Sequence, residues 1–150
     1  MYDGKARPIG VNTLLSQPKQ LFADGLIYIN TAQWGFAYTA FSTLCQQKEF
    51  KSVAVMYNMA LCHYSVKEYT KAISVLTEAL TQIATPSISH QSNRNLPQGL
   101  LNHEYENNLH RSALNETAVE LNNNLVKLRI RRLLVDVQLE LKNWQEISRL

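Results

Sequence analysis

The sequence predicts an all-α protein, and three observations support that prediction. Residues 19–85 and the residues after Gln98 contain no proline, and both stretches repeat Leu, Ala and aromatic residues at the three-to-four-residue spacing of helices. No segment alternates apolar and polar residues over six or more positions, as a half-buried strand would. Five glycines and four prolines in 150 residues are too few for a turn-dense β architecture.

Length, charge and cysteine content indicate one small cytoplasmic domain. A chain of 150 residues buries enough surface to fold without a metal or a disulfide. The formal net charge of +3 is too small to indicate nucleic acid or an anionic membrane as a partner. The first twenty residues lack the apolar run of a secretory signal, and we expect Cys45 and Cys62 to be buried free thiols.

The longest uncharged stretch, residues 25–47, has the length of a membrane span. Polar residues interrupt it at five positions, among them Asn30, Gln33 and Thr39. We therefore expect it to form packed helices of a water-exposed protein and predict no membrane contact.

Proline and polar residues divide the chain into four predicted parts of one domain. Residues 1–18 form an N-terminal arm, and residues 19–86 form two helical repeats. Residues 87–107, rich in Ser, Asn and Gln, are expected to be a polar loop. Residues 108–150 are expected to hold a long helix and a partial third repeat. An apolar series at helical spacing predicts this helix, and we expect the helix to cover the end of the second repeat. The series is Leu114, Ala118, Leu121, Leu125, Leu128 and Val135.

The two repeats are visible as similarity at an offset of 35 residues. Small residues recur where two helices would cross closely, and large residues recur beside them, where they would fill the remaining space. Trp34 and Tyr69 recur at the predicted turns between helices. The matched pairs are Leu21 and Met56, Gly25 and Ala60, Tyr28 and His63, Trp34 and Tyr69, Ala37 and Ala72, Phe41 and Leu76, and Leu44 and Ala79.

This pattern resembles the tetratricopeptide repeat (TPR) family, in which two helices form a repeat of about this length. Asp24 and His63 depart from the family pattern, where Leu and Tyr are usual, and we expect His63 to be a buried packing residue with one hydrogen-bonded nitrogen. A weaker third copy keeps the same spacing of twelve from Val135 to Ile147. The resemblance thus implies an α-solenoid of about two and a half repeats with a long C-terminal helix.

The resemblance implies a non-enzymatic adaptor or scaffold that binds a partner peptide or helix in a groove lined by the first helix of each repeat. Two alternatives remain open: the groove residues are core covered by the N-terminal arm or by the chain's own C-terminal helix, or the chain self-associates and a second copy completes the third repeat. The groove residues that the resemblance implies are Phe22, Leu26, Ile29, Asn30, Tyr57, Asn58, Leu61, Tyr64, Ser65, Arg129 and Arg132, with Asp136 as a further addition.

Other functions have weaker support in the sequence. The TPR subclass that binds chaperone carboxylates uses a Lys/Asn/Asn/Lys/Arg set, of which Asn58 is matched and Arg129 can replace one Lys, whereas Phe22 and Leu26 do not fit. His103, Glu106 and His110 are the one candidate metal cluster, and we expect them to be solvated instead. Lys127, Arg129, Arg131 and Arg132 are basic but mixed with apolar residues. We predict no enzyme, no cofactor, no metal and no nucleic-acid partner.

Overall fold

The computed structural model describes residues 17–83, 96–116, 122–143, 146–147 and 149–150, and within these it is all-helical. Four helices follow one another in the first half: α2 (Pro18–Asn30), α3 (Trp34–Cys45), α4 (Val53–Ser65) and α5 (Tyr69–Ile83). The 3₁₀ turn η1 (Lys48–Phe50) joins α3 to α4. The second half contains α6 (Gln98–Asn107), the 3₁₀ turn η3 (Leu109–Arg111) and α8 (Asn123–Leu141).

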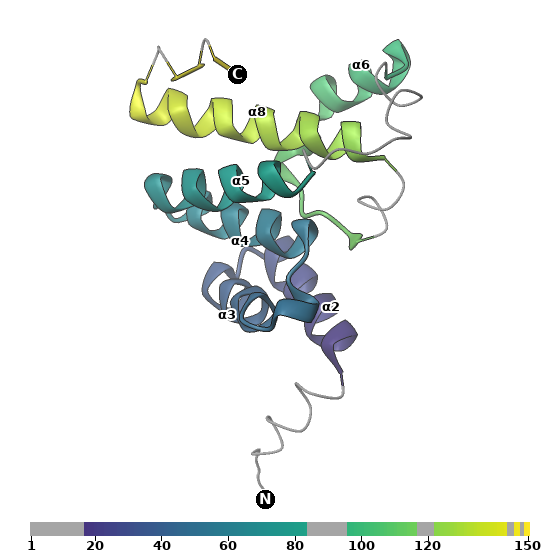
Figure 1. Ribbon diagram of the computed structural model, residues 1–150, viewed down its shortest axis with the longest axis vertical. Helices are drawn as coiled ribbons and strands as arrows, with labels where there is room; N and C mark the ends of the chain where they lie inside the picture. Colours follow the sequence, from purple (N-terminus) through teal and green to yellow (C-terminus); the bar gives the residue numbers. More distant parts are fainter. Residues whose placement is uncertain (1–16, 84–95, 117–121, 144–145, 148) are drawn as a thin grey trace, which may run out of the picture.

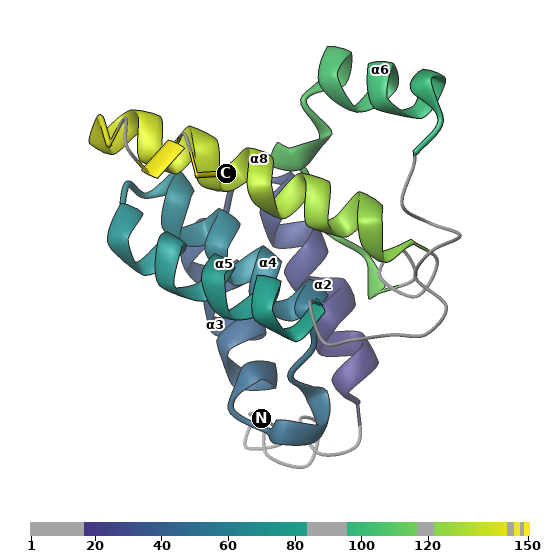
Figure 2. The same ribbon diagram turned by 45° about the horizontal axis from the view of Figure 1, so that its top comes forward.

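The helices form a stack in which each packs on the next. Helix α2 packs on α3, α3 on α4, α4 on α5, and α5 on α8, so that α8 lies across the end of the second hairpin (Figure 1). Helix α6 stands beside α8 and contacts η3 (Figure 2). The core therefore runs through the stack, from Phe41 in the first hairpin through Met56 and Leu76 to Ile130 in α8.

Helix starts are set by local residues. Pro18 stands in the first turn of α2, where its missing N–H costs no hydrogen bond. Ser52 caps α4 by accepting a hydrogen bond from the Val55 amide at 3.2 Å. Asn122 caps α8, because its side-chain oxygen accepts from the amides of Asn124 and Leu125, both at 3.1 Å.

Three helices end in the same backbone turn. A left-handed residue follows each of them, with φ of 59° at Ala32, 68° at Lys67 and 59° at Lys142. The next amide donates to the carbonyl five residues back, from Gln33 to Tyr28, from Glu68 to His63 and from Asn143 to Gln138, at 2.7–2.9 Å. The first two turns are offset by the 35 residues that separate the sequence repeats. The second and third are 75 residues apart, with α6 and η3 lying in the interval.

Small residues lie at the helix contacts where the sequence places them. Ala37, Ala60 and Ala72 are fully buried, and so is Ala79. Gly25 is also buried, and a Cβ atom added there would lie 2.6 Å from Cζ of Phe41. Any side chain at Gly25 would therefore displace the buried Phe41 ring.

Part of the predicted organisation differs from the structure. The expected polar loop of residues 87–107 contains α6, which the Ser- and Asn-rich composition did not indicate. The expected helical series does not include Leu114, because residues 112–115 are non-helical and Asn122 caps the helix only further along. The N-terminal arm up to residue 16, together with Ala118, Leu121 and Trp144, lies outside the described residues.

Candidate functional site

The predicted groove residues of α2 and α4 lie in a line but are not an open surface. In α2, Phe22 and Ile29 are 7% exposed, Leu26 is half-buried and Asn30 is exposed. In α4, Tyr57, Asn58 and Leu61 are buried, while Tyr64 is half-buried and Ser65 exposed. A partner therefore cannot reach the centre of the line in this conformation, because the chain's own residues cover it.

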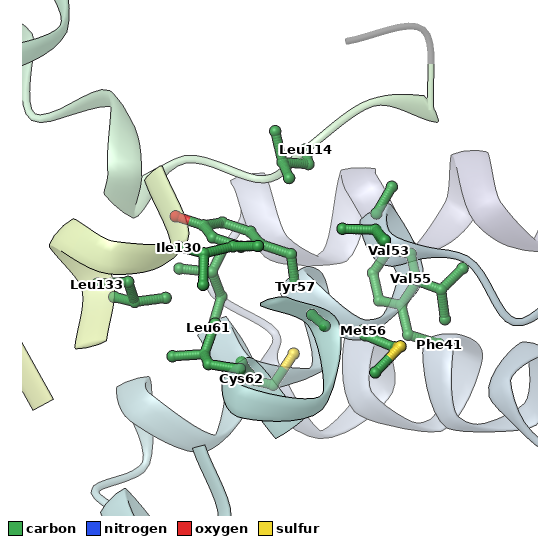
Figure 3. Packing of buried hydrophobic residues seen from close by; sticks show 14 of the residues in the cluster. Phe41, Val53, Val55, Met56, Tyr57, Leu61, Cys62, Leu114, Ile130 and Leu133 are labelled. Carbon is green, nitrogen blue, oxygen red and sulfur yellow. The ribbon is translucent and has the colours of Figure 1, made fainter. Parts of the chain in front are cut away.

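The cover is a segment of the same chain, residues 111–116, which we call the cover segment. Its anchor is Leu114, which is 1% exposed and belongs to the same apolar cluster as Tyr57, Leu61, Ile130 and Leu133. Figure 3 shows Leu114 approaching this cluster from the cover segment, while Ile130 and Leu133 approach it from α8. The chain thus covers the centre of α4 itself, but through the cover segment together with α8, and not through the C-terminal helix alone as one alternative expected.

Asn58 holds the backbone of the cover segment. Its side-chain Nδ2 donates to the Leu114 carbonyl at 2.9 Å, and its Oδ1 accepts from the Leu114 amide at 2.7 Å. Both hydrogen bonds are buried. A side-chain amide offers this donor and acceptor together, so Asn58 can pair with both backbone groups of one residue, whatever side chain that residue carries.

Tyr57 holds the residue just before the cover segment. Its hydroxyl donates to the carbonyl of His110 and lies 3.4 Å from the carbonyl of Arg129. Burial raises the pKa of the Tyr57 hydroxyl well above its usual range, so the group remains a protonated donor. Tyr57 is thus a structural anchor between η3 and α8.

The cover segment follows α4 along its length. Arg111 lies over the Tyr64 ring, 5.9 Å from its centroid, near the C-terminal end of α4. Leu114 pairs with Asn58 at mid-helix, and Glu116 borders a cavity that Val55 also lines near the helix start. The segment therefore runs antiparallel to α4.

The cavity beside Glu116 has a volume of about 210 Å³. Phe22, Leu44, Phe50 and Val55 contribute its apolar wall. Its remaining lining residues are Pro18, Lys19, Glu49, Ser52 and Glu116. The cavity therefore lies beside the start of α4, whereas Leu114 lies beside the middle of that helix.

The predicted groove residues of α8 serve the chain itself. Arg129 makes a two-pronged ion pair with Glu104 of α6, at 2.9 and 2.8 Å, and Glu104 is 1% exposed. Arg132 donates to the Glu104 carbonyl at 3.1 Å and lies over the Tyr105 ring. These two cations fasten α6 to α8 and are not available for a partner in this conformation.

Asp136 fastens the start of the cover segment. Its Oδ2 lies 2.7 Å from Nε2 of His110 and accepts from Arg111 at 2.9 Å. Burial by itself raises the pKa of Asp136, but the hydrogen bonds from His110 and Arg111 outweigh it and hold that pKa below its usual value.

The candidate metal residues do not gather. His103 and Glu106 are exposed on α6, and His103 contacts Asn107 of the same helix. His110 is buried, at 2% exposed, and not solvated as expected, since it lies on η3 against Asp136 after the left-handed residue Asn108 ends α6. Among the residues that the structure describes, no group of three His, Cys, Asp or Glu side chains could hold a metal ion.

The histidine and the two cysteines that we expect to be buried lie on α3 and α4. His63 is 6% exposed and its Nδ1 lies 2.9 Å from Oε1 of Glu68, which confirms the expected buried histidine with a hydrogen-bonded nitrogen. Burial raises the pKa of the Cys62 thiol to about 12, whereas Cys45 is half-buried instead of buried as expected.

Sequence reasoning missed Glu104, and it placed Leu114 in a covering helix instead of in the non-helical segment that closes the site. Leu114 is four residues before Ala118, a spacing that favours a helix, so its position in a non-helical segment left no signal. Glu104 is 25 residues from Arg129, and nothing local links the two.

No family model, curated protein or solved structure matches the chain. In the described part of the molecule, every helix is too short or too polar to cross a bilayer.

Proposed function

We propose that the protein is a non-enzymatic interaction module that holds a non-helical peptide of a partner along α4. The hydrogen-bond pair between Asn58 and the backbone of Leu114 is the observation that carries this proposal. A groove that binds a backbone through both its donor and its acceptor, and one side chain through an apolar site, has the chemistry of a peptide-binding groove. Here the peptide is the chain's own cover segment.

The repeated architecture supports the finer assignment to a TPR-like α-solenoid. Two hairpins end their first helices in equivalent turns, and Gly25 and Ala60 occupy equivalent buried positions in α2 and α4. Helix α8 packs on α5 and ends in the same turn, as the first helix of a third hairpin would. We assign the protein to the cytoplasm, with support from its two free cysteines, which a reducing compartment preserves.

The test uses a fluorescent peptide with the sequence of residues 109–116, LHRSALNE, and the full-length chain. We expect a Leu114→Asp variant, whose own segment no longer fits, to bind this peptide at least about tenfold more tightly than the wild type, in which the groove is occupied. Fluorescence anisotropy measures the affinity, and circular dichroism verifies that the variant remains helical. Leu114→Ala serves as the milder variant if Leu114→Asp loses helicity.

Two controls define the site. A peptide with aspartate at the position of Leu114 should not bind, and Ser74→Ala, on the exposed face of α5, should behave as the wild type. A helical Leu114→Asp or Leu114→Ala chain that fails to bind the peptide would refute the proposed function.

Self-association is a second candidate, favoured by exposed leucines at the end of α8. Leu139 and Leu141 are 41% and 36% exposed, next to the turn that ends the helix. Light scattering over a range of concentrations tests this candidate, and a strict monomer excludes it.

A further inference from the structure

Resting on the proposed function, we propose that the groove along α4 has two apolar subsites and that the cover segment fills only the first. The first subsite holds Leu114 beside Asn58, and the second is the cavity bordered by Glu116. The partner we infer is a non-helical peptide with an apolar residue at the position of Leu114 and a second apolar residue two positions later. Such a peptide fills both subsites and displaces the cover segment.

The register of the cover segment defines the spacing between subsites. From Val55 to Tyr64, α4 rises about 14 Å. The five steps from residue 111 to residue 116 span at most about 17 Å. The non-helical residues 112–115, between the 3₁₀ turn that ends at Arg111 and the helical residue Glu116, therefore carry the chain along α4, with Arg111 over the Tyr64 ring and Glu116 at the cavity that Val55 lines. Leu114 lies in the core cluster and Glu116, two positions later, borders the cavity, so a peptide that follows the same course can place a side chain in each subsite.

The second subsite is a poor match for the residue that now borders it. Phe22, Leu44, Phe50 and Val55 form the apolar wall of the cavity, yet the residue that the cover segment brings to its border is Glu116. Glu116 is itself exposed, and a carboxylate buried against these side chains would lose its hydration. The cavity exceeds the roughly 150 Å³ that accommodates a benzene molecule in a protein core. A leucine or phenylalanine side chain therefore suits it better.

The cover segment is built to be displaced. Ser112, Asn115 and Glu116 are exposed, so Leu114 is the one fully buried side chain within residues 111–116. Nδ1 of the preceding His110 is buried without a hydrogen-bond partner in the described part of the chain, which weakens the closed arrangement. The ion pair of Glu104 with Arg129 fastens α6 upstream and need not break when residues 111–116 leave.

The first experiment compares three peptides on the full-length Leu114→Asp chain by fluorescence anisotropy. They are LHRSALNE, the same peptide with leucine as its last residue, and a matched control with that leucine moved one position earlier. We expect the peptide with leucine last to bind roughly fivefold more tightly than LHRSALNE, since it buries part of one leucine side chain. The control should show no gain. Equal affinity for the two leucine-substituted peptides would overturn the second subsite.

The second experiment tests displacement in the wild-type chain and needs no disruptive substitution. The Leu114 amide donates to Asn58, so its hydrogen exchange reports release of the cover segment. We expect it to exchange at least about tenfold faster than the amide of Leu61, which is protected by the body of α4. Glu116→Leu, on an exposed residue, should slow Leu114 exchange roughly fivefold by filling the cavity.

The outcomes separate this inference from the proposed function. Exchange of Leu114 and Leu61 at one common rate would refute displacement, even if the Leu114→Asp chain binds peptides. An unchanged Leu114 exchange rate in Glu116→Leu would refute the second subsite. Binding of all three peptides with equal affinity would leave the proposed function standing and remove the spacing rule.

Discussion

The two hairpins and the part of the chain that covers them are held together by different forces. In α2–α5, backbones approach through Ala37, Ala60 and Ala72, and large apolar side chains fill the remaining space. The covering part, residues 98–116, has one buried apolar anchor, Leu114, and is otherwise fastened by polar groups: the ion pair of Glu104, the hydroxyl of Tyr57 and the amide of Asn58. Apolar packing stabilises the stack as one body, whereas a few directed contacts can break together and release a segment without unfolding the rest.

The largest effect is expected inside the hairpins. Phe41→Ala removes a ring that is fully buried against Gly25 and lies edge-on to Phe22, and should lower the free energy of unfolding by about 3–5 kcal/mol. Phe36→Ala, five residues earlier in the same helix, is the matched control, because that ring is 63% exposed and its loss should change stability by less than about 0.5 kcal/mol. Urea denaturation measures both. Similar losses of stability in the two variants would contradict the assignment of Phe41, and not Phe36, to the core.

A smaller and more local effect is expected in the covering part. Glu104→Gln keeps the shape of the side chain but weakens the charge-assisted hydrogen bonds from Arg129, at a cost of about 2 kcal/mol. Hydrogen exchange should show faster opening of α6 while the amides of α4 remain protected. Glu106→Gln on the exposed side of α6 is the control and should exchange as the wild type. If α4 opens together with α6, the two regions are one cooperative unit.

The smallest effect is expected at Asp136 and depends on pH. Asp136→Asn weakens two charge-assisted contacts, to His110 and Arg111, and should destabilise the covering part by about 1.5 kcal/mol at pH 7. Because the folded-state pKa of Asp136 is lowered, its contribution is present above the ordinary aspartate pKa, near 4, and is lost as pH falls through the folded-state value. Leu114 exchange in wild type and variant should therefore converge in acid. A constant difference down to pH 2 would refute this role.

Local pattern was sufficient to predict the hairpins. Helical periodicity and the recurrence of Gly25, Ala37, Ala60 and Ala72 are properties of short stretches, and these positions are buried in the structure. The pairing of His63 with Glu68 also follows from local geometry, because both residues flank one turn. The proline-free stretch from residue 19 onward correctly indicated the four helices α2–α5.

The occupant of the groove was not predictable in the same way. Leu114 reaches Asn58 across 56 positions of sequence, and Arg129 reaches Glu104 across 25. Neither pair has a periodic signature. The helix α6 was missed because its ten residues are mostly polar and only Glu104 among them is buried.

The amino-acid sequence alone determined that the chain is helical, where α2 to α5 lie and which small residues sit at their contacts, because spacing along a helix fixes which side chains share a face. The folded chain alone decided that Tyr57, Asn58 and Leu61 are covered, that Arg129 and Arg132 hold α6, and that a cavity remains beside Glu116. Those outcomes depend on where the cover segment lies, and the contacts with Asn58 and Asp136 that hold it there join residues far apart in sequence.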